Sequence, residues 1–217
     1  MALGGEQGMD RWEKTFDETI AKGATADDPA HDLLHFRRVV ASAKKVAVAE
    51  EARLEVVVPA AWLHDLVIVP KNDPRRTQAS RLSGVAAVEL LTQIGYPPEF
   101  HADIAHAVEV HSFSANIDPR TKEAAVVQDA DRLDGIGAIG LARCFITAGL
   151  MKRPIYSEID PFCEEREPDD QSFTIAHFYR KLFRTVETLK TAAGREEGRR
   201  RAEIMKRYLT DLADELP

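Results

Sequence analysis

Apolar residues recur every three or four positions along most of the chain, and this spacing constrains the fold more than any other feature. Leu33, Phe36, Val40, Ala43 and Ala47 show it most clearly, because side chains at this spacing share one face of an α-helix. We therefore expect an all-α protein, a compact helical bundle. The pattern predicts helices over residues 9–22, 29–49, 51–68, 77–94, 98–111, 120–132, 135–150, 172–192 and 195–215.

Capping and helix-breaking residues set the expected limits of these helices. Asp28 and Pro29 are expected to begin the second helix, as N-cap and first-turn residue. Two prolines interrupt regular structure in the polar segment 69–74, and residues 152–171 read as a long surface loop. The 217 residues are 44% hydrophobic, which suffices for the core of one domain. We expect a single domain over residues 1–217, with its core at about 28–150 and C-terminal helices at about 172–215 packed on it.

Charge and cysteine content limit the partners and the location of the protein. The net charge of −7 argues against a nucleic-acid partner, because polyanion binding needs a basic surface. The chain has only Cys144 and Cys163, no apolar run of about 20 residues, and no signal-peptide pattern in its first residues. We expect a cytoplasmic protein without a membrane partner, and a homo-oligomer is compatible with the sequence.

A His-Asp doublet, His64-Asp65, closes the apolar run at residues 60–63. His35 lies upstream and Asp131 downstream, each on another predicted helix, and a helical bundle can bring such side chains around one inward-facing cavity. Two imidazoles and two carboxylates suit Mn, Fe, Ni, Co, Zn or, less well, Mg. His35, His64, Asp65 and Asp131 are therefore candidate ligands of one divalent metal ion, and such an ion can polarise a phosphoryl oxygen. Taken singly, each residue has another reading: His35 as a partly buried hydrogen-bonding histidine, Asp65 as a cap or a partner of an arginine, and Asp131 as part of an acidic surface.

Further polar residues lie where they can serve a phosphate substrate. Arg38 follows His35 by one helical turn and can hold phosphate oxygens bidentately, with an ion pair to a carboxylate as the alternative. Lys71 can reach a phosphate from its loop, although simple solvation is the commoner role of such a lysine. Asp134 follows Asp131 by one turn and either orients a ligand or water or is a helix-end charge.

Three histidines follow one another at five-residue steps, at positions 101, 106 and 111. Each step turns about 140° around a helix, so the three cannot share one face. We therefore expect a mononuclear centre, with His111 as a substrate contact or as a proton donor to the leaving group. His101 and His106 are expected at the surface or in packing contacts.

These segments resemble the HD superfamily of metal-dependent phosphohydrolases. His35 matches the first His of the superfamily, His64-Asp65 the defining doublet, and Asp131 the distal Asp. A bacterial subgroup of stand-alone HD hydrolases is more similar still. The motifs that carry this closer resemblance are residues 31–38, 111–114, 128–140 and 177–182.

The resemblance implies a function as well as a fold. It implies an all-α HD domain, a bound divalent ion and hydrolysis of a phosphoester or phosphoanhydride, with Asp65 as the base that orients water. The subgroup is associated with pyrophosphohydrolysis of nucleoside triphosphates, so the implied substrate is a small phosphate compound, a nucleotide. The alternatives are a non-catalytic HD module that senses nucleotides and a dinuclear-iron HD oxygenase.

Overall fold

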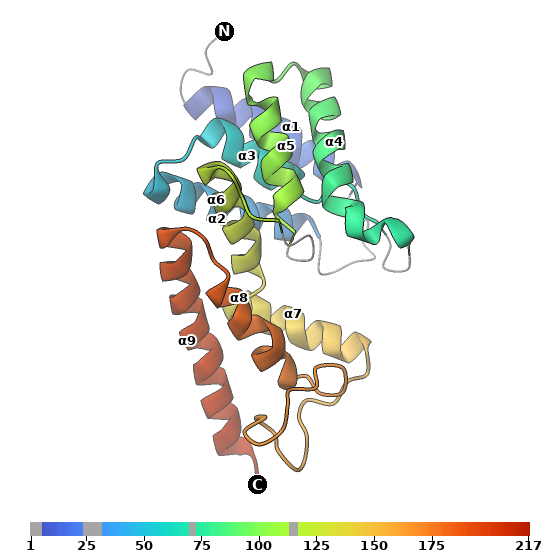
Figure 1. The fold of residues 1–217 in the computed structure, drawn as a ribbon, viewed down its shortest axis with the longest axis vertical. Helices are drawn as coiled ribbons and strands as arrows, with labels where there is room; N and C mark the ends of the chain where they lie inside the picture. The colour runs from blue at the N-terminus through green and yellow to red at the C-terminus, as the bar shows by residue number, and fades with distance from the viewer. Residues whose placement is uncertain (1–5, 24–31, 70–72, 113–116) are drawn as a thin grey trace. The chain divides into compact units, whose positions relative to one another are not determined.

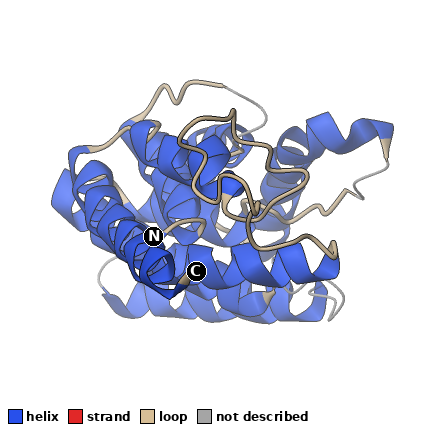
Figure 2. Cartoon of the chain, turned by 90° about the horizontal axis from the view of Figure 1, so that it is seen from below, coloured by secondary structure: helices blue, strands red, loops and turns tan. Residues whose placement is uncertain are grey.

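The computed structural model describes residues 6–23, 32–69, 73–112 and 117–217, and within these ranges it contains helices and no strand (Figure 2). The expected all-α class is thus confirmed. The chain divides into two compact units. The first comprises residues 1–131 and 190–193, and the second comprises residues 132–189 and 194–217. The expectation of a single domain over the whole chain stays a prediction.

The first unit is organised around a short apolar helix, α3 (Leu54–Leu63), in which residues 56–63 are all buried. This helix packs against α1, α2, α4 and α5 (Figure 1). Because it has no polar face, α3 needs neighbours on all sides, which makes it the centre of this unit. The elements around it are α1 (Glu6–Gly23), α2 (Leu33–Glu50), η1 (Pro74–Gln78), α4 (Ala79–Ile94), η2 (Pro98–Phe100), α5 (His101–Val110) and the first part of α6 (Lys122–Asp134).

The first residue of α2 and the last residue of α3 differ from those predicted. Helix α2 begins at Leu33, and its N-cap is Asp32, whose carboxylate accepts a hydrogen bond from the His35 N–H at 2.9 Å. The prediction of Asp28 as N-cap was therefore wrong; residues 28 and 29 lie outside the described ranges. Helix α3 ends at Leu63 and not at residue 68. His64 Nδ1 donates a hydrogen bond to the Ala61 carbonyl oxygen, which would accept from a backbone N–H if the helix continued for another turn.

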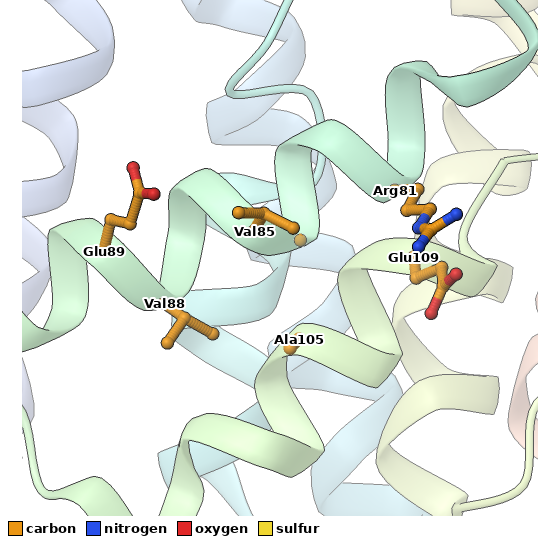
Figure 3. Close-up of a pocket in the computed structure, with 7 residues that line it drawn as sticks. Arg81, Val85, Val88, Glu89, Ala105 and Glu109 are labelled. Atoms are coloured by element: carbon orange, nitrogen blue, oxygen red, sulfur yellow. The ribbon is translucent and has the colours of Figure 1, made fainter.

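The pair α4 and α5 lies side by side at the outside of this unit (Figure 1). Gly84 permits the close approach, because a Cβ at this position would lie only 3.1 Å from the carbonyl oxygen of Ala105. A groove runs along the two helices (Figure 3), and its lining contains none of the predicted metal ligands. The lining residues are Arg81, Gly84, Val85, Val88, Glu89, Ala105 and Glu109.

The second unit combines the end of α6 with α7 (Gly137–Leu150), the π-helical η3 (Phe178–Leu182), α8 (Phe183–Glu187) and most of α9 (Ala192–Glu215). Aromatic rings join these helices: Tyr208 stacks on Phe178 at 6.0 Å and meets Phe145 edge-on at 5.6 Å. The loop expected over 152–171 is present. The helix predicted over 172–192 is much shorter, since the helical residues there are 176–187.

No single helix in the described ranges is long and apolar enough to cross a membrane. Of the described helices, only the consecutive pair α6 and α7, which is bent at its junction, has the combined length and apolar composition of such a span.

Candidate metal centre

Three histidines of the first unit lie together although they come from three different segments. His35 is on α2, His64 follows α3 and His111 follows α5, and their exposed fractions are 1%, 0% and 3%. The His64 ring centroid lies 5.3 Å from that of His35 and 4.9 Å from that of His111. The core of this unit thus holds a cluster of imidazoles that water hardly reaches.

Two carboxylates complete the cluster. Asp131 Oδ1 lies 3.7 Å from His35 Nε2 and 3.9 Å from His64 Nε2. Asp65 Oδ2 lies 3.7 Å from His64 Nε2, and Asp65 Oδ1 lies 3.4 Å from His111 Nε2. The side chains of Asp65 and Asp131 are 27% and 25% exposed. A ligand can therefore approach from the carboxylate side, whereas the imidazoles form the buried side.

Backbone carbonyls orient two of the imidazoles. His64 Nδ1 lies 2.8 Å from the Ala61 oxygen, and His111 Nδ1 lies 2.6 Å from the Val108 oxygen. Since a carbonyl only accepts hydrogen bonds, each Nδ1 carries the proton and donates it. In the neutral ring this leaves Nε2 with a lone pair directed at the cluster. The same arrangement orients histidine ligands in metal sites.

Burial and charge act in opposite directions on these histidines. Desolvation lowers the pKa of His64 to about 4, although Asp65 opposes this shift, so the ring is neutral near pH 7. Burial also disfavours a charged His111, but its hydrogen bond to Asp65 and the charges of Asp65 and Asp131 raise its pKa to about 9. The two carboxylates therefore attract positive charge into this cluster, as a proton on His111 or as a metal ion.

The donor atoms fit a divalent cation. His35 Nε2 and His64 Nε2 lie 3.2 Å apart, and the ligand atoms within each of two groups lie within 4.8 Å of one another. Metal–ligand bonds of about 2.1 Å place neighbouring ligands about 3.0–3.4 Å apart, so the His35, His64 and Asp131 atoms, which lie 3.2, 3.7 and 3.9 Å apart, would have to approach one another by less than about 1 Å. The two groups are His35, His64 and Asp131, and His64, Asp65 and His111.

Helix α6 supplies Asp131 and two further polar residues that are buried and that were not among the predicted site residues. Asp129 is fully buried and accepts hydrogen bonds from the Lys190 and Thr191 N–H groups and from the Thr191 hydroxyl, at 2.7–2.8 Å. Gln128 is 1% exposed and donates to the Val110 oxygen at 2.7 Å. The available signal was the position of both polar residues inside the otherwise apolar run 124–130.

The other two histidines of the five-residue series, and three further predicted site residues, differ in their contacts and in their place in the chain. His101 bonds to the Tyr96 carbonyl and His106 accepts from the Arg120 N–H, as expected for histidines in packing contacts. Asp134 belongs to the second unit, where it pairs with Arg143 at 2.9 Å. Arg38 lies on α2 one turn after His35 and is partly exposed. Lys71 is not among the described residues.

Comparison with known proteins identifies the family. Residues 33–136 match the HD domain model. The Bacillus subtilis protein YpgQ is 32% identical over 197 residues, which cover 89% of this chain and 88% of YpgQ. The crystal structure of YpgQ in complex with ADP has a TM-score of 0.73 and covers 94% of this chain and 98% of that one. An HD-superfamily hydrolase from Bacillus thuringiensis is 26% identical, with a TM-score of 0.73 and coverage of 97% and 98%.

The matched segment of the HD domain contains the donors from α2, from the turn after α3, and from α6, and the similarity to YpgQ extends over most of the chain. A helical fold with buried histidines beside partly exposed aspartates agrees with this match. The chain therefore belongs to the HD superfamily of metal-dependent phosphohydrolases.

Proposed function

We propose that this phosphohydrolase acts on a nucleotide and that it hydrolyses nucleoside triphosphates to monophosphates and pyrophosphate. The observation that carries the proposal is the group of His35, His64 and Asp131, whose ligand atoms converge on a volume that one cation can fill. The structure of YpgQ with ADP supports a nucleotide as the ligand. A divalent ion, when bound, supplies Lewis acidity to a phosphoryl oxygen and to water.

Asp65 is the residue best placed to take a proton from the attacking water. Its two oxygens lie 3.7 Å from His64 Nε2 and 3.4 Å from His111 Nε2, and its side chain reaches solvent. Proton transfer to a positioned carboxylate in such a site contributes to hydrolysis as general base catalysis. We assign this role to Asp65, in addition to its role as a metal ligand.

His111 and Arg38 complete the proposed machinery. His111 Nδ1 is held by the Val108 carbonyl, so the protonated ring has one further N–H, at Nε2. That N–H faces Asp65 in this structure, and we propose that it is given to the leaving oxygen when substrate is bound. Arg38 lies one turn after His35 on α2, where a guanidinium can hold phosphate oxygens. Lys71 as a second phosphate contact and Asp134 as an orienting residue stay predictions.

Product analysis tests this proposal. Nucleoside mono-, di- and triphosphates are incubated with Mn, Mg, Ni or Co in water enriched in oxygen-18, and products are identified by phosphorus NMR. We expect triphosphates to yield pyrophosphate and a monophosphate that carries the label. Release of inorganic phosphate from the γ-position would instead identify a phosphatase and contradict the proposed bond cleavage.

The same experiment separates the alternatives when metal content is measured beside it. Tight nucleotide binding without turnover with any of the metals would indicate a sensing module. Two iron ions per chain with dioxygen uptake would indicate an oxygenase. Because the two donor groups share His64, the number of ions per chain has to be measured, and we expect one.

A further inference from the structure

Gln128 connects two parts of the metal centre. It lies on α6, one turn before Asp131, and its side chain is buried. Its Nε2 donates to the Val110 oxygen at 2.7 Å and, more weakly, to the Ile117 oxygen at 3.3 Å. Val110 is the last residue of α5 and directly precedes His111. One amide group therefore binds the chain before and after His111.

The orientation of this amide follows from its partners. Both contacts are carbonyl oxygens, which only accept, so the amide nitrogen must face them and the orientation cannot be reversed. Gln128 Oε1 is buried and has no hydrogen-bond partner within the described ranges. An unpaired buried carbonyl lowers stability. An apolar residue would avoid that cost but would remove the donor from the Val110 carbonyl, so the role of this glutamine is the link that its amide makes between α6 and the end of α5.

We propose that Gln128 is a positioning residue that acts through His111. The bond from His111 Nδ1 to Val108 fixes the ring relative to α5, and the bond from Gln128 to Val110 fixes the end of α5 relative to α6. Together these bonds keep His111 Nε2 beside Asp65, 3.4 Å from its Oδ1. The effect on turnover rests on the proposed function, whereas the effect on the His111 ring does not.

A double-mutant cycle tests the coupling. Gln128→Met approximately keeps the side-chain volume and removes the amide donor. This substitution is introduced into the wild type and into His111→Gln, and the hydrolysis of ATP with Mn²⁺ is measured in both backgrounds. In the wild type we expect kcat to fall by about 10- to 100-fold, the usual effect of losing a residue that orients a catalytic group. In His111→Gln the same substitution is expected to cost less than about threefold.

Tyr96→Phe is the matched control. The Tyr96 hydroxyl donates to the Glu55 carbonyl at 2.7 Å, so this substitution also removes one side-chain hydrogen bond to a backbone carbonyl in the same unit, but not at the cluster. We expect its kcat to equal that of the wild type. An equal loss from Gln128→Met in both backgrounds would show a general structural role and overturn the proposal. If Gln128→Met does not fold, Gln128→Asn, which shortens the reach of the amide, enters the same cycle.

NMR of nitrogen-15-labelled histidine keeps the test independent of turnover. The His111 imidazole signals are assigned from their absence in His111→Gln. Gln128→Met is expected to shift or broaden these signals, and Tyr96→Phe is expected to leave them in place. If the wild type hydrolyses no nucleotide, the proposed function fails but this measurement still decides the role of Gln128. Unchanged His111 signals in Gln128→Met would contradict the proposed positioning role of Gln128.

Discussion

Two carboxylates on α6, only two positions apart, lie in opposite environments. Asp129 is fully buried, and N–H and O–H donors from Lys190 and Thr191 surround its oxygens. The side chain of Asp131 is 25% exposed, and its neighbours are the Nε2 atoms of His35 and His64. At His64 that nitrogen has no proton to donate in the neutral ring. Neutral donors of the protein stabilise the charge of Asp129, whereas we expect Asp131 to be available to a bound cation.

The difference shows how a structural carboxylate is told from a metal ligand in this fold. Hydrogen bonds to a charged acceptor stabilise a buried carboxylate and join segments that are distant in the chain. A carboxylate that meets an unprotonated imidazole nitrogen, as Asp131 meets His64 Nε2, gains little in the metal-free fold but can contribute much to ion binding. We therefore expect Asp129 to stabilise the fold and Asp131 to bind the metal ion.

The largest expected effect is loss of activity on removal of Asp131. Asp131→Ala should lower kcat/KM for a nucleoside triphosphate by well over the roughly 100-fold that is typical of losing a residue around the metal. The metal-free protein should keep its fold, with a free energy of unfolding within about 1 kcal/mol of the wild type, because one of two neighbouring negative charges is removed. Steady-state kinetics and urea unfolding in EDTA measure the two quantities. Substantial activity in metal-analysed Asp131→Ala would remove Asp131 from the centre.

The reverse pattern is expected for Asp129. Asp129→Ala leaves two N–H groups and a hydroxyl without their acceptor, so the free energy of unfolding should fall by about 3 kcal/mol. Asp129→Asn keeps one acceptor oxygen and should lose less. Urea unfolding of both variants gives these values, and the Mn²⁺ affinity of the folded fraction should change little. An Asp129→Ala variant that loses Mn²⁺ binding but keeps the stability of the wild type would contradict the contrast between the two aspartates.

A smaller effect is expected at Glu123, a further carboxylate of α6, which pairs with the guanidinium of Arg53. Its hydrogen bond to Arg53, at 2.8 Å, lowers its pKa to about 2 despite the opposing effect of burial. The stabilisation is present above the ordinary pKa of 4.5 and is lost as the pH falls from there towards 2. With screening by solvent we expect about 1 kcal/mol. Acid titration of unfolding free energy should show this loss in the wild type and a weaker one in Arg53→Met; equal curves would argue against it.

The sequence was sufficient for the features that depend on local patterns. Helical periodicity placed most helices within a few residues, and His35, His64, Asp65 and Asp131 are brought together as expected. Helix ends were harder to predict than helix interiors. Asp28 and Asp32 are both suitable N-cap residues before the same apolar pattern. The short helix near residues 176–187 includes a π-helical turn, which periodicity of 3.6 residues does not reveal.

Long-range partners account for what could not be predicted. The partners of Asp129 lie 61 and 62 positions further along the chain, where no local pattern indicates them. Gln128 binds a carbonyl 18 positions before it, across a segment whose path the sequence does not specify. His111 was expected in the site as a substrate contact or as a proton donor to the leaving group. Its distance of 3.4 Å from Asp65 places it at the cluster, and its role stays a prediction.

Titration of the metal-stripped protein with Mn²⁺ tests the central claim most directly, with bound ion followed by electron paramagnetic resonance. The wild type is expected to bind one ion per chain tightly, Asp129→Asn to bind it equally well once folded, and Asp131→Ala to bind it at least about 100-fold more weakly. Equal affinity of the wild type and Asp131→Ala would contradict a metal centre built on His35, His64, Asp65 and Asp131.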